Sequence, residues 1–243
     1  TPKQKSRGLP VSFDIDLIQA RLEMKPAFSS VRGVFDVTGD LDVRRAGGGQ
    51  QGMISVRSVL HPGDRLAVQF DVNKKRPLLL VANAHEAQGG ALAGAVGLPA
   101  GQPFDLQVSA TGKTSQGRLI AFASSGVTKP IDIQGAWTPK GGQASGKILL
   151  TASTLTRKLA ARLGPEAVFV LTGTRAEPGL YDLTARATSA NLAVTAKGKG
   201  NLGERRLGPK GLALTLDTPH LSQISGGPQM GPSRAVGVLT GTL

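Results

Sequence analysis

The side chains that most often carry chemistry are few and scattered in this 243-residue chain. Its three histidines, His61, His85 and His220, do not have the spacing of metal ligands. It has no cysteine, which excludes thiolate metal sites, a cysteine nucleophile and disulfides. It contains no G-x-S-x-G nucleophile elbow, and its aspartates alternate regularly, as they do on a solvated strand face. We therefore expect a protein that is not an enzyme and that has no metal site and no cofactor.

Two glycine-rich stretches match parts of phosphate-binding motifs. Gly112, Lys113 and Thr114 resemble the end of a P-loop, but the first glycine of that motif would fall at Gln107, and a strand is expected to follow. Residues 198–203 fit the G-x-G-x-x-G pattern, but the residues after them cannot form the helix that holds a pyrophosphate. We interpret residues 198–203 as a turn and expect neither stretch to bind phosphate.

The dominant pattern is the alternation of apolar and polar residues that a half-buried strand requires. In residues 33–43, apolar residues alternate with Thr38 and three aspartates, and in residues 11–17 Leu17 is expected on the same side as Ile15. Further runs of this kind occupy residues 53–60, 66–72, 78–84, 104–110, 118–124, 131–137, 146–151, 167–173, 181–187, 190–196, 212–218 and 235–243. About a dozen strands with turn signals between them predict an all-β, mainly antiparallel fold.

Two segments break the strand period and carry good helix formers. They predict short helices near 89–98 and 153–163. In the second helix, Leu155, Leu159 and Leu163 are expected to form one apolar stripe. The fold class is therefore all-β with a few short helices.

The helical segments are spaced like parts of an internal repeat. Each leads into a strand, and residues 220–233 are a weaker third copy that leads into the strand at 235–243. The strand starts lie about 65 residues apart, which predicts a repeat of one short helix and several strands. A coincidence of spacing is the alternative.

The number of strands restricts the architecture to two forms. Open twisted sheets rarely exceed about ten strands without curling or splitting. Curling gives an elongated half-pipe, or β-taco, with an apolar interior groove, whereas splitting gives a sandwich in which the apolar faces cover each other. The residues leave both open, although an aromatic content of 4% suits an open groove slightly better than a filled core. The residues expected to line the groove are Phe35, Val37, Leu41, Leu66, Val68, Phe70, Phe104, Leu106, Val108, Ile131, Ile133 and Trp137.

The net charge of +13 would attract phosphate groups, in nucleic acids or in lipid headgroups. It would also arise on a solvated basic surface that has no such partner. Because aromatic residues for base stacking are scarce, we expect the charge to serve no nucleic acid.

The ends of the chain suggest a piece of a longer protein. No apolar run approaches the roughly 18 residues of a membrane helix. The chain begins at Thr1 rather than at a methionine and stops at Leu243 within a strand-like alternation. We interpret residues 1–243 as a single continuous segment, with a signal or anchor expected upstream.

Three stretches of the sequence carry a family resemblance. Residues 9–43 contain a strand pair and an x-L-x-L-x-G-x-L-x-L-like strand, and residues 78–112 and 155–175 contain a strand or short helix that leads into a strand. These stretches resemble the repeating elements of the TamB family of translocation and assembly module subunits, in the AsmA-like superfamily. The likeness covers most of the chain and rests on pattern rather than on invariant residues. The family's N-terminal anchor and C-terminal region are not recognisable here.

The resemblance implies a cell-envelope protein anchored in the inner membrane through a segment not present in this chain. Its β half-pipe would cross the periplasm and shelter phospholipid acyl chains or nascent outer-membrane proteins. It would act in phospholipid transport to the outer membrane or in outer-membrane protein (autotransporter) assembly. It would also work with the outer-membrane barrel TamA, and the family has no catalytic residues. Two other classes stay open: a structural or adhesive β-solenoid of a secreted protein, and a basic nucleic-acid-binding β module.

Overall fold

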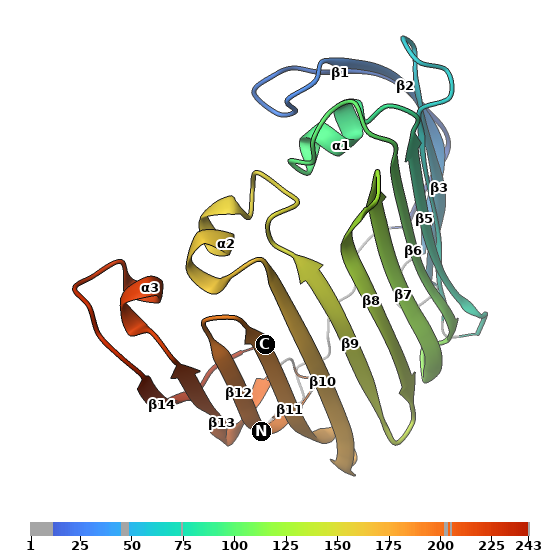
Figure 1. The fold of residues 1–243 in the computed structure, drawn as a ribbon. Coiled ribbons are helices and arrows are strands. Elements are labelled where there is room, and N and C mark those ends of the chain that lie inside the picture. The colour runs from blue at the N-terminus through green and yellow to red at the C-terminus, as the bar shows by residue number, and fades with distance from the viewer. Residues whose placement is uncertain (1–11, 45–48, 74, 202–203, 205, 243) are drawn as a thin grey trace. The chain divides into compact units, whose positions relative to one another are not determined.

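The computed structural model describes residues 12–44, 49–73, 75–201, 204 and 206–242. It contains fourteen strands and three short helices, and the order of the strands in the sheet follows the sequence from β1 to β14 (Figure 1). The prediction of an all-β, antiparallel fold with a few short helices is confirmed. Parts of three predictions fall outside the described residues. They are residues 9–11 of the first family-like stretch, Val11 of the first predicted strand and residues 202–203. The chain divides into two compact units, Thr1–Val127 and Thr128–Leu243, which we describe separately.

Unit 1 is an antiparallel meander in which each strand pairs with the next one along the chain. A single short helix, α1 (Ala91–Ala95), interrupts the meander between its fifth and sixth strands. The strands are β1 (Phe13–Met24), β2 (Gly33–Arg44), β3 (Gly49–Ser58), β4 (Arg65–Val72), β5 (Leu78–Glu86), β6 (Phe104–Lys113) and β7 (Gln116–Ser125).

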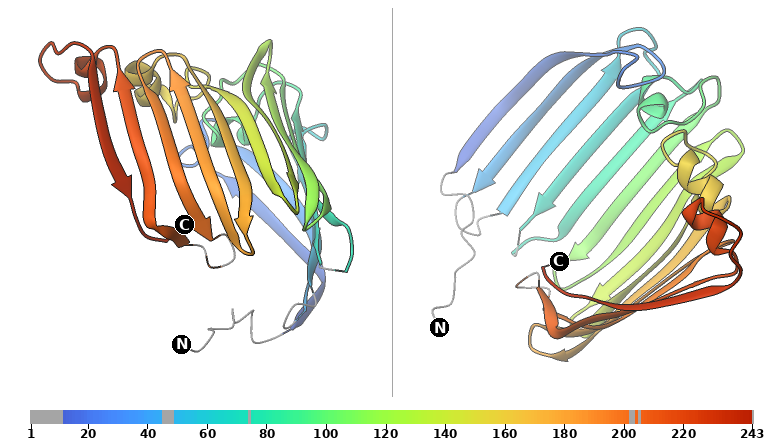
Figure 2. Two further views of the ribbon diagram at one scale, coloured as in Figure 1. Left: turned by 90° about the horizontal axis from the view of Figure 1, so that it is seen from below. Right: turned by 90° about the vertical axis from the view of Figure 1, so that its left-hand side faces the viewer.

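Unit 2 repeats this arrangement with two helices, α2 (Arg157–Leu163) and α3 (Leu221–Ser225). Both helices lie at the same end of the strands of unit 2 (Figures 1 and 2). Each strand again pairs antiparallel with its successor: β8 (Thr128–Thr138), β9 (Gly141–Leu149), β10 (Glu166–Glu177), β11 (Leu180–Ser189), β12 (Ala193–Asn201), β13 (Arg206–Thr218) and β14 (Ser233–Leu239).

The positions of the helices agree with the predicted repeat. The helices α1, α2 and α3 begin at residues 91, 157 and 221, which are 66 and 64 residues apart. Four strands separate one helix from the next, and every helix leads into a strand. The repeated element is therefore one short helix followed by four strands, and residues 220–233 contain its third helix.

The apolar stripe predicted on the second helix is wrong. The helix begins only at Arg157, because the Thr156 hydroxyl donates to the Leu150 carbonyl at 2.6 Å and holds the preceding residues in a turn. Leu155 therefore lies before the helix and is 71% exposed, and Leu159 is 50% exposed. Because Leu155 precedes the helix, the three leucines do not form one helical stripe.

A β-bulge in β1 overturns the position predicted for Leu17. Ile15 pairs with Leu41 and Ile18 pairs with Gly39, so β1 contains one more residue than β2 over this interval. The extra residue reverses the alternation beyond Ile15. Ile18 then occupies the side expected for Leu17, which is 67% exposed.

Candidate functional site

The register of unit 1 places its alternating apolar residues on one side of the sheet. Residues directly opposite each other on neighbouring antiparallel strands lie on the same face. Three rows of apolar residues cross all seven strands on this face. The first row joins Ala20, Val37, Val56, Leu66, Ala84, Leu106 and Ala123; the second joins Ile18, Gly39, Ile54, Val68, Ala82, Val108 and Ala121; and the third joins Ile15, Leu41, Gly52, Phe70, Leu80, Ala110 and Leu119.

All nine residues predicted from the sequence for this unit lie on that face. Seven are members of the three rows, and Phe35 and Phe104 precede Val37 and Leu106 by two residues on the same strands. We call this surface the unit 1 apolar face. The nine residues predicted from the sequence come only from β2, β4 and β6, and the apolar residues of β1, β3, β5 and β7 complete the same rows.

Unit 2 has a corresponding face, which contains the other three predicted residues, Ile131, Ile133 and Trp137. We call it the unit 2 apolar face. Its rows are richer in small residues. The main rows join Ile133, Gly146, Phe169, Ala187, Val194, Leu216 and Ala235; Gly135, Ala144, Leu171, Ala185, Ala196, Leu214 and Gly237; and Trp137, Gly142, Gly173, Leu183, Gly198, Leu212 and Leu239.

In both units, the side of the sheet opposite the apolar face carries charged residues. Arg21 donates to Asp36 across β1 and β2 at 2.8 Å, and this hydrogen bond lowers the pKa of the Asp36 carboxyl. In unit 2, Lys147 pairs with Glu166 and Arg234 pairs with Asp217. In each unit, therefore, one side of the sheet carries the apolar rows and the other side carries the ion pairs. The charged side is not free of apolar residues, because exposed Met53, Ile120, Val168, Val170 and Val238 lie on it.

The apolar faces are only partly removed from solvent. Of the twelve predicted residues, only Phe35 and Phe104 are buried, at 2% and 3% exposure, and the other ten are half-buried. Leu80 and Leu171, which lie within the rows, are 36% and 44% exposed. Residues that face a second packed sheet are normally buried completely. The exposure of these rows does not fit a filled sandwich core within either unit.

Helix α1 covers one end of the unit 1 apolar face. Ala91 packs against Met24, Phe35 and Val56 in the buried cluster of this unit. The Ser29 hydroxyl, between β1 and β2, donates to the Ala91 carbonyl at 2.9 Å. Helix α1, which belongs to the β5–β6 connection, therefore packs against β1, β2 and β3 and covers the apolar face at that end of the strands.

A buried carboxylate holds α1 in this position. Glu86, the last residue of β5, is completely buried and accepts the backbone N–H groups of Gly90, Leu92 and Ala93 at 2.9, 2.8 and 2.8 Å. The sequence analysis missed this role. The available signal was an acidic residue at the apolar-side position that ends a strand, followed shortly by a Gly-Gly pair.

Two clefts contain polar side chains. The cleft beside α1 has a volume of about 450 Å³ and includes Asp64 and Glu86. Asp64 accepts the Ala87 N–H at 3.1 Å, so both carboxylates already accept backbone N–H groups. The two carboxylates in this cleft hold neighbouring loops in place and do not form a pair for acid–base chemistry.

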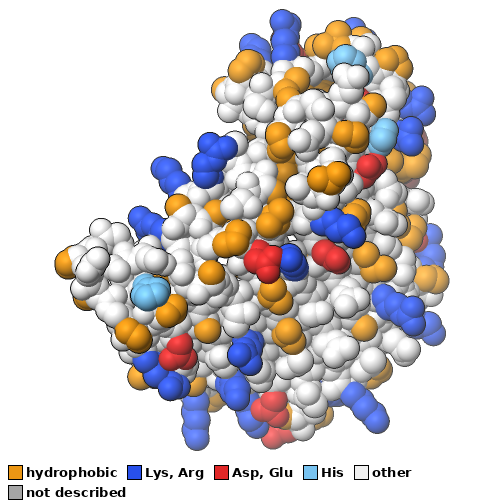
Figure 3. Space-filling view, in the orientation of Figure 1, with side chains coloured by type: hydrophobic (Ala, Val, Ile, Leu, Met, Phe, Trp, Pro, Cys, Tyr) orange, Lys and Arg blue, Asp and Glu red, His pale blue; other side chains and the backbone are white. Residues whose placement is uncertain are grey.

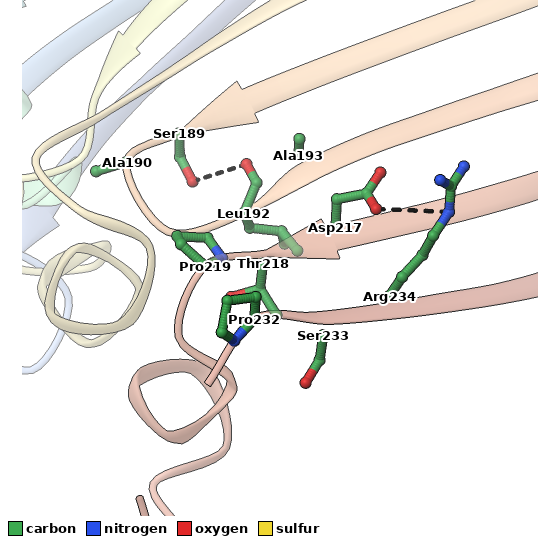
Figure 4. Close-up of a pocket in the computed structure, with 10 residues that line it drawn as sticks. All are labelled: Ser189, Ala190, Leu192, Ala193, Asp217, Thr218, Pro219, Pro232, Ser233 and Arg234. Carbon is green, nitrogen blue, oxygen red and sulfur yellow. Dashed lines mark hydrogen bonds and ion pairs between the residues drawn. The ribbon is translucent and has the colours of Figure 1, made fainter. Parts of the chain in front are cut away.

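The cleft in unit 2 has a volume of about 560 Å³ and lies between the β11–β12 turn and the ends of β13 and β14 (Figure 4). Its Ser189 hydroxyl donates to the Leu192 carbonyl at 3.2 Å, and Asp217 pairs with Arg234 at 3.5 Å. No histidine lines it. A serine without a neighbouring base is not an activated nucleophile.

His85 and Asp105 form the contact most similar to part of a catalytic triad. The His85 Nδ1 atom lies 2.7 Å from the Asp105 Oδ1 atom on the charged side of unit 1. The residue paired with His85 on the other neighbouring strand is Arg65, and Ser124 is paired with Asp105. The serine is therefore next to the carboxylate rather than next to the imidazole, which is the wrong order for a triad.

The described part of the chain contains no group of three or more histidine, aspartate or glutamate residues that could hold a metal ion. The predicted strand after Gly112 and Lys113 is confirmed, because these residues end β6 and β7 begins at Gln116. The interpretation of residues 198–203 as a turn needs correction, because Gly198–Asn201 form the end of β12. Among the described helices, none has the length and apolar character needed to cross a membrane.

No family model, curated protein or solved structure matches this chain. The resemblance to the TamB family stays a hypothesis drawn from sequence patterns, and the two apolar faces are the features from which a function is inferred.

Proposed function

We propose that this chain is a non-enzymatic segment of a TamB-like envelope protein and that its apolar faces line a groove for phospholipid acyl chains. The observation that carries the proposal is the set of three uninterrupted apolar rows across seven strands, which remain partly exposed. Monomeric soluble proteins rarely expose contiguous apolar surface of this kind without a ligand or partner for it.

The dimensions of the rows suit an acyl chain. Seven strands at about 4.8 Å spacing extend over roughly 29 Å. One leaflet of a bilayer is about 15 Å deep in its hydrocarbon part. A tail lying along a row would therefore remain on the unit 1 apolar face over its whole length. Each methylene group that leaves water contributes about 0.8 kcal/mol.

The unit 2 apolar face supports the same cargo in a different way. Glycine and alanine occupy many of its positions. Neighbouring side chains close the space above some of these glycines, as Ile133 and Phe169 do at Gly146, whereas other positions are open. A Cβ atom added at Gly173 would meet only the Leu183 Cδ2 atom, at 3.3 Å. This space on an apolar surface favours a flexible hydrocarbon ligand.

The cellular setting in the proposal comes from the family resemblance. It places the chain in the periplasm, anchored in the inner membrane through a segment not present here, with TamA as its outer-membrane partner. Phospholipid is the cargo that we favour over nascent outer-membrane proteins, because the rows are apolar from edge to edge in unit 1.

Photocrosslinking at two neighbouring positions tests the proposal. A benzophenone amino acid at Val68, on the unit 1 apolar face, should capture phospholipid when the chain is made in bacteria. The same group at Gln69 points to the charged side and should capture none. Equal lipid capture at both positions, or none at Val68 in folded protein, would refute acyl-chain binding.

A further inference from the structure

We propose that a patch at the α2 end of unit 2 docks on the surface of an anionic lipid bilayer. The patch consists of Leu155, Arg157, Lys158, Leu159 and Arg162, and we call it the α2 rim patch. Its partner would be a membrane surface rather than a single lipid tail, so the inference goes beyond the proposed function.

The leucines of the α2 rim patch face solvent. Leu155 is 71% exposed and Leu159 is 50% exposed, and α2 has no buried residue. In the loop that follows α3, Met230 is also 41% exposed. Exposed leucines on a short helix contribute little to the stability of the folded chain. These side chains are therefore available to a partner.

The charge around these leucines is positive and uncompensated. Residues 150–165 contain three cations and no acidic residue, and residues 219–233 on the adjacent α3 side also contain no acidic residue. The first acidic residues beyond them, Glu166 and Asp217, are paired with Lys147 and Arg234. Within the described ranges, none of the three patch cations forms an ion pair. Figure 3 shows Lys and Arg side chains projecting around this end of the molecule.

The patch is held in place without being covered. The Asn191 N–H donates to the Leu163 carbonyl at 3.1 Å, and the Asn191 side-chain amide donates to the Arg162 carbonyl at 2.9 Å. These bonds fix the C-terminal end of α2 to the β11–β12 turn. The Thr156 hydroxyl fixes the other end to Leu150. The helix is therefore presented from a rigid rim, and little order has to be gained on docking.

The combination of exposed leucines and cations identifies the class of partner. Interfacial segments insert apolar side chains among lipid headgroups while their basic residues contact anionic phosphates. A nucleic acid would use the cations but would leave Leu155 and Leu159 in water, and the patch has no aromatic residue for base stacking. An anionic bilayer uses both features.

The expected strength follows from the number of cations. Each basic residue near an anionic membrane surface changes the partition constant about fivefold, so three cations together contribute roughly 100-fold at low salt. The effect falls off within the Debye length and therefore weakens as salt is added.

Vesicle co-sedimentation of the whole chain tests the proposal. Vesicles of phosphatidylcholine mixed with phosphatidylglycerol should bind the protein, and pure phosphatidylcholine vesicles should bind it far less. Changing Arg157, Lys158 and Arg162 to serine should lower binding to the anionic vesicles roughly 100-fold. Changing Leu155 and Leu159 to serine should lower binding to the same vesicles at every salt concentration. Circular dichroism would show that each variant keeps its strands.

The control removes the same charge elsewhere in unit 2. Arg186→Ser, Lys197→Ser and Lys210→Ser together also lower the net charge by three, and all three residues are exposed. The control should keep most of the anionic-vesicle binding. Equal loss in the patch and control variants, or a patch variant that loses DNA binding while keeping vesicle binding, would overturn the proposal. Crosslinking of lipid at Val68 should be unchanged in the patch variants, which separates a failure of this inference from a failure of the acyl-groove function.

Discussion

At the scale of single residues, the most informative position is Glu86. The strand alternation places it on the unit 1 apolar face, where a carboxylate is unfavourable unless its oxygens are satisfied. Three backbone N–H groups of the following loop and helix satisfy them. The sequence could predict the side of the sheet on which Glu86 lies. It could not predict the partner of Glu86, because the partner is the backbone of a helix whose position depends on Ser29, far away in the chain.

Replacing Glu86 should therefore loosen α1 and destabilise unit 1. Glu86→Ala leaves one buried and two part-buried N–H groups without their acceptors and should lower the free energy of unfolding by about 3 kcal/mol. Glu86→Gln retains one carbonyl oxygen and should lose less. Urea unfolding of both variants measures the difference. If Glu86→Ala and the wild type unfold at the same urea concentration, the carboxylate does not hold the helix.

The Arg21–Asp36 pair gives a prediction for pH. Its hydrogen bond lowers the pKa of Asp36 in the folded chain, so the pair stabilises the fold above the ordinary aspartate pKa. This stabilisation is lost as the pH falls through the lowered pKa. Arg21→Gln should raise the Asp36 pKa towards its ordinary value, as measured by NMR titration of the carboxyl carbon. The melting temperatures of variant and wild type should converge in acid, and a constant difference at all pH values would contradict the pair's role.

At the scale of elements, the strands were predictable and their irregularities were not. Alternation identified the strands because each has one apolar side and one solvent-exposed polar side. The register then follows from the short connections between antiparallel strands. The bulge between Ile15 and Ile18 left no sign in the sequence, since both readings of residues 13–18 keep apolar residues on a face. The length of α2 was overestimated because helix propensity does not show that Thr156 forms a turn with Leu150.

Glycines within the strands provide a test of how open the unit 2 apolar face is. In a close-packed core, inserting a larger side chain costs about 1–3 kcal/mol. At Gly173 the added Cβ meets only the Leu183 side chain, so Gly173→Val should change the free energy of unfolding by less than about 1 kcal/mol. Gly112→Val is the matched contrast. Gly112 has φ of +131°, and its added Cβ would overlap the Gln116 carbonyl oxygen, so this change should cost about 2 kcal/mol or more. Chemical unfolding of both variants measures the two costs, and a large loss at Gly173 would indicate a filled core.

At the scale of the whole molecule, the chain is a repeat of strands that bury one face incompletely. Each strand extends the apolar rows on one side of its unit, and within the described part of the chain no second layer of strands covers those rows. Stability then comes mainly from contacts between neighbouring strands, as in other repeat architectures. The sequence could not decide between an open face and a closed sandwich, because both require the same alternation. The exposure of the central rows decides against a filled core within either unit.

The last prediction concerns a charge placed on the unit 1 apolar face. Val68→Asp and Leu106→Arg put a charge on half-buried positions in the middle of the apolar rows. In a closed core an unpaired charge costs several kcal/mol, which is comparable with the stability of a whole domain. On an open face the charge stays hydrated, so the folded state should survive with a modest loss in melting temperature. An acyl chain on that row would lose roughly 25 cal/mol per Å² of apolar contact around the charge, which amounts to a few kcal/mol of affinity over several methylene groups.

The matched variants Gln69→Asp and Gln107→Arg place the same charges on the opposite side of the same strands and should affect neither property. Thermal unfolding and phospholipid binding should be measured for all four variants. If Val68→Asp and Leu106→Arg abolish the folded state, the apolar face is a closed core and does not bind lipid; if they fold and bind lipid as the wild type does, the acyl chains lie elsewhere.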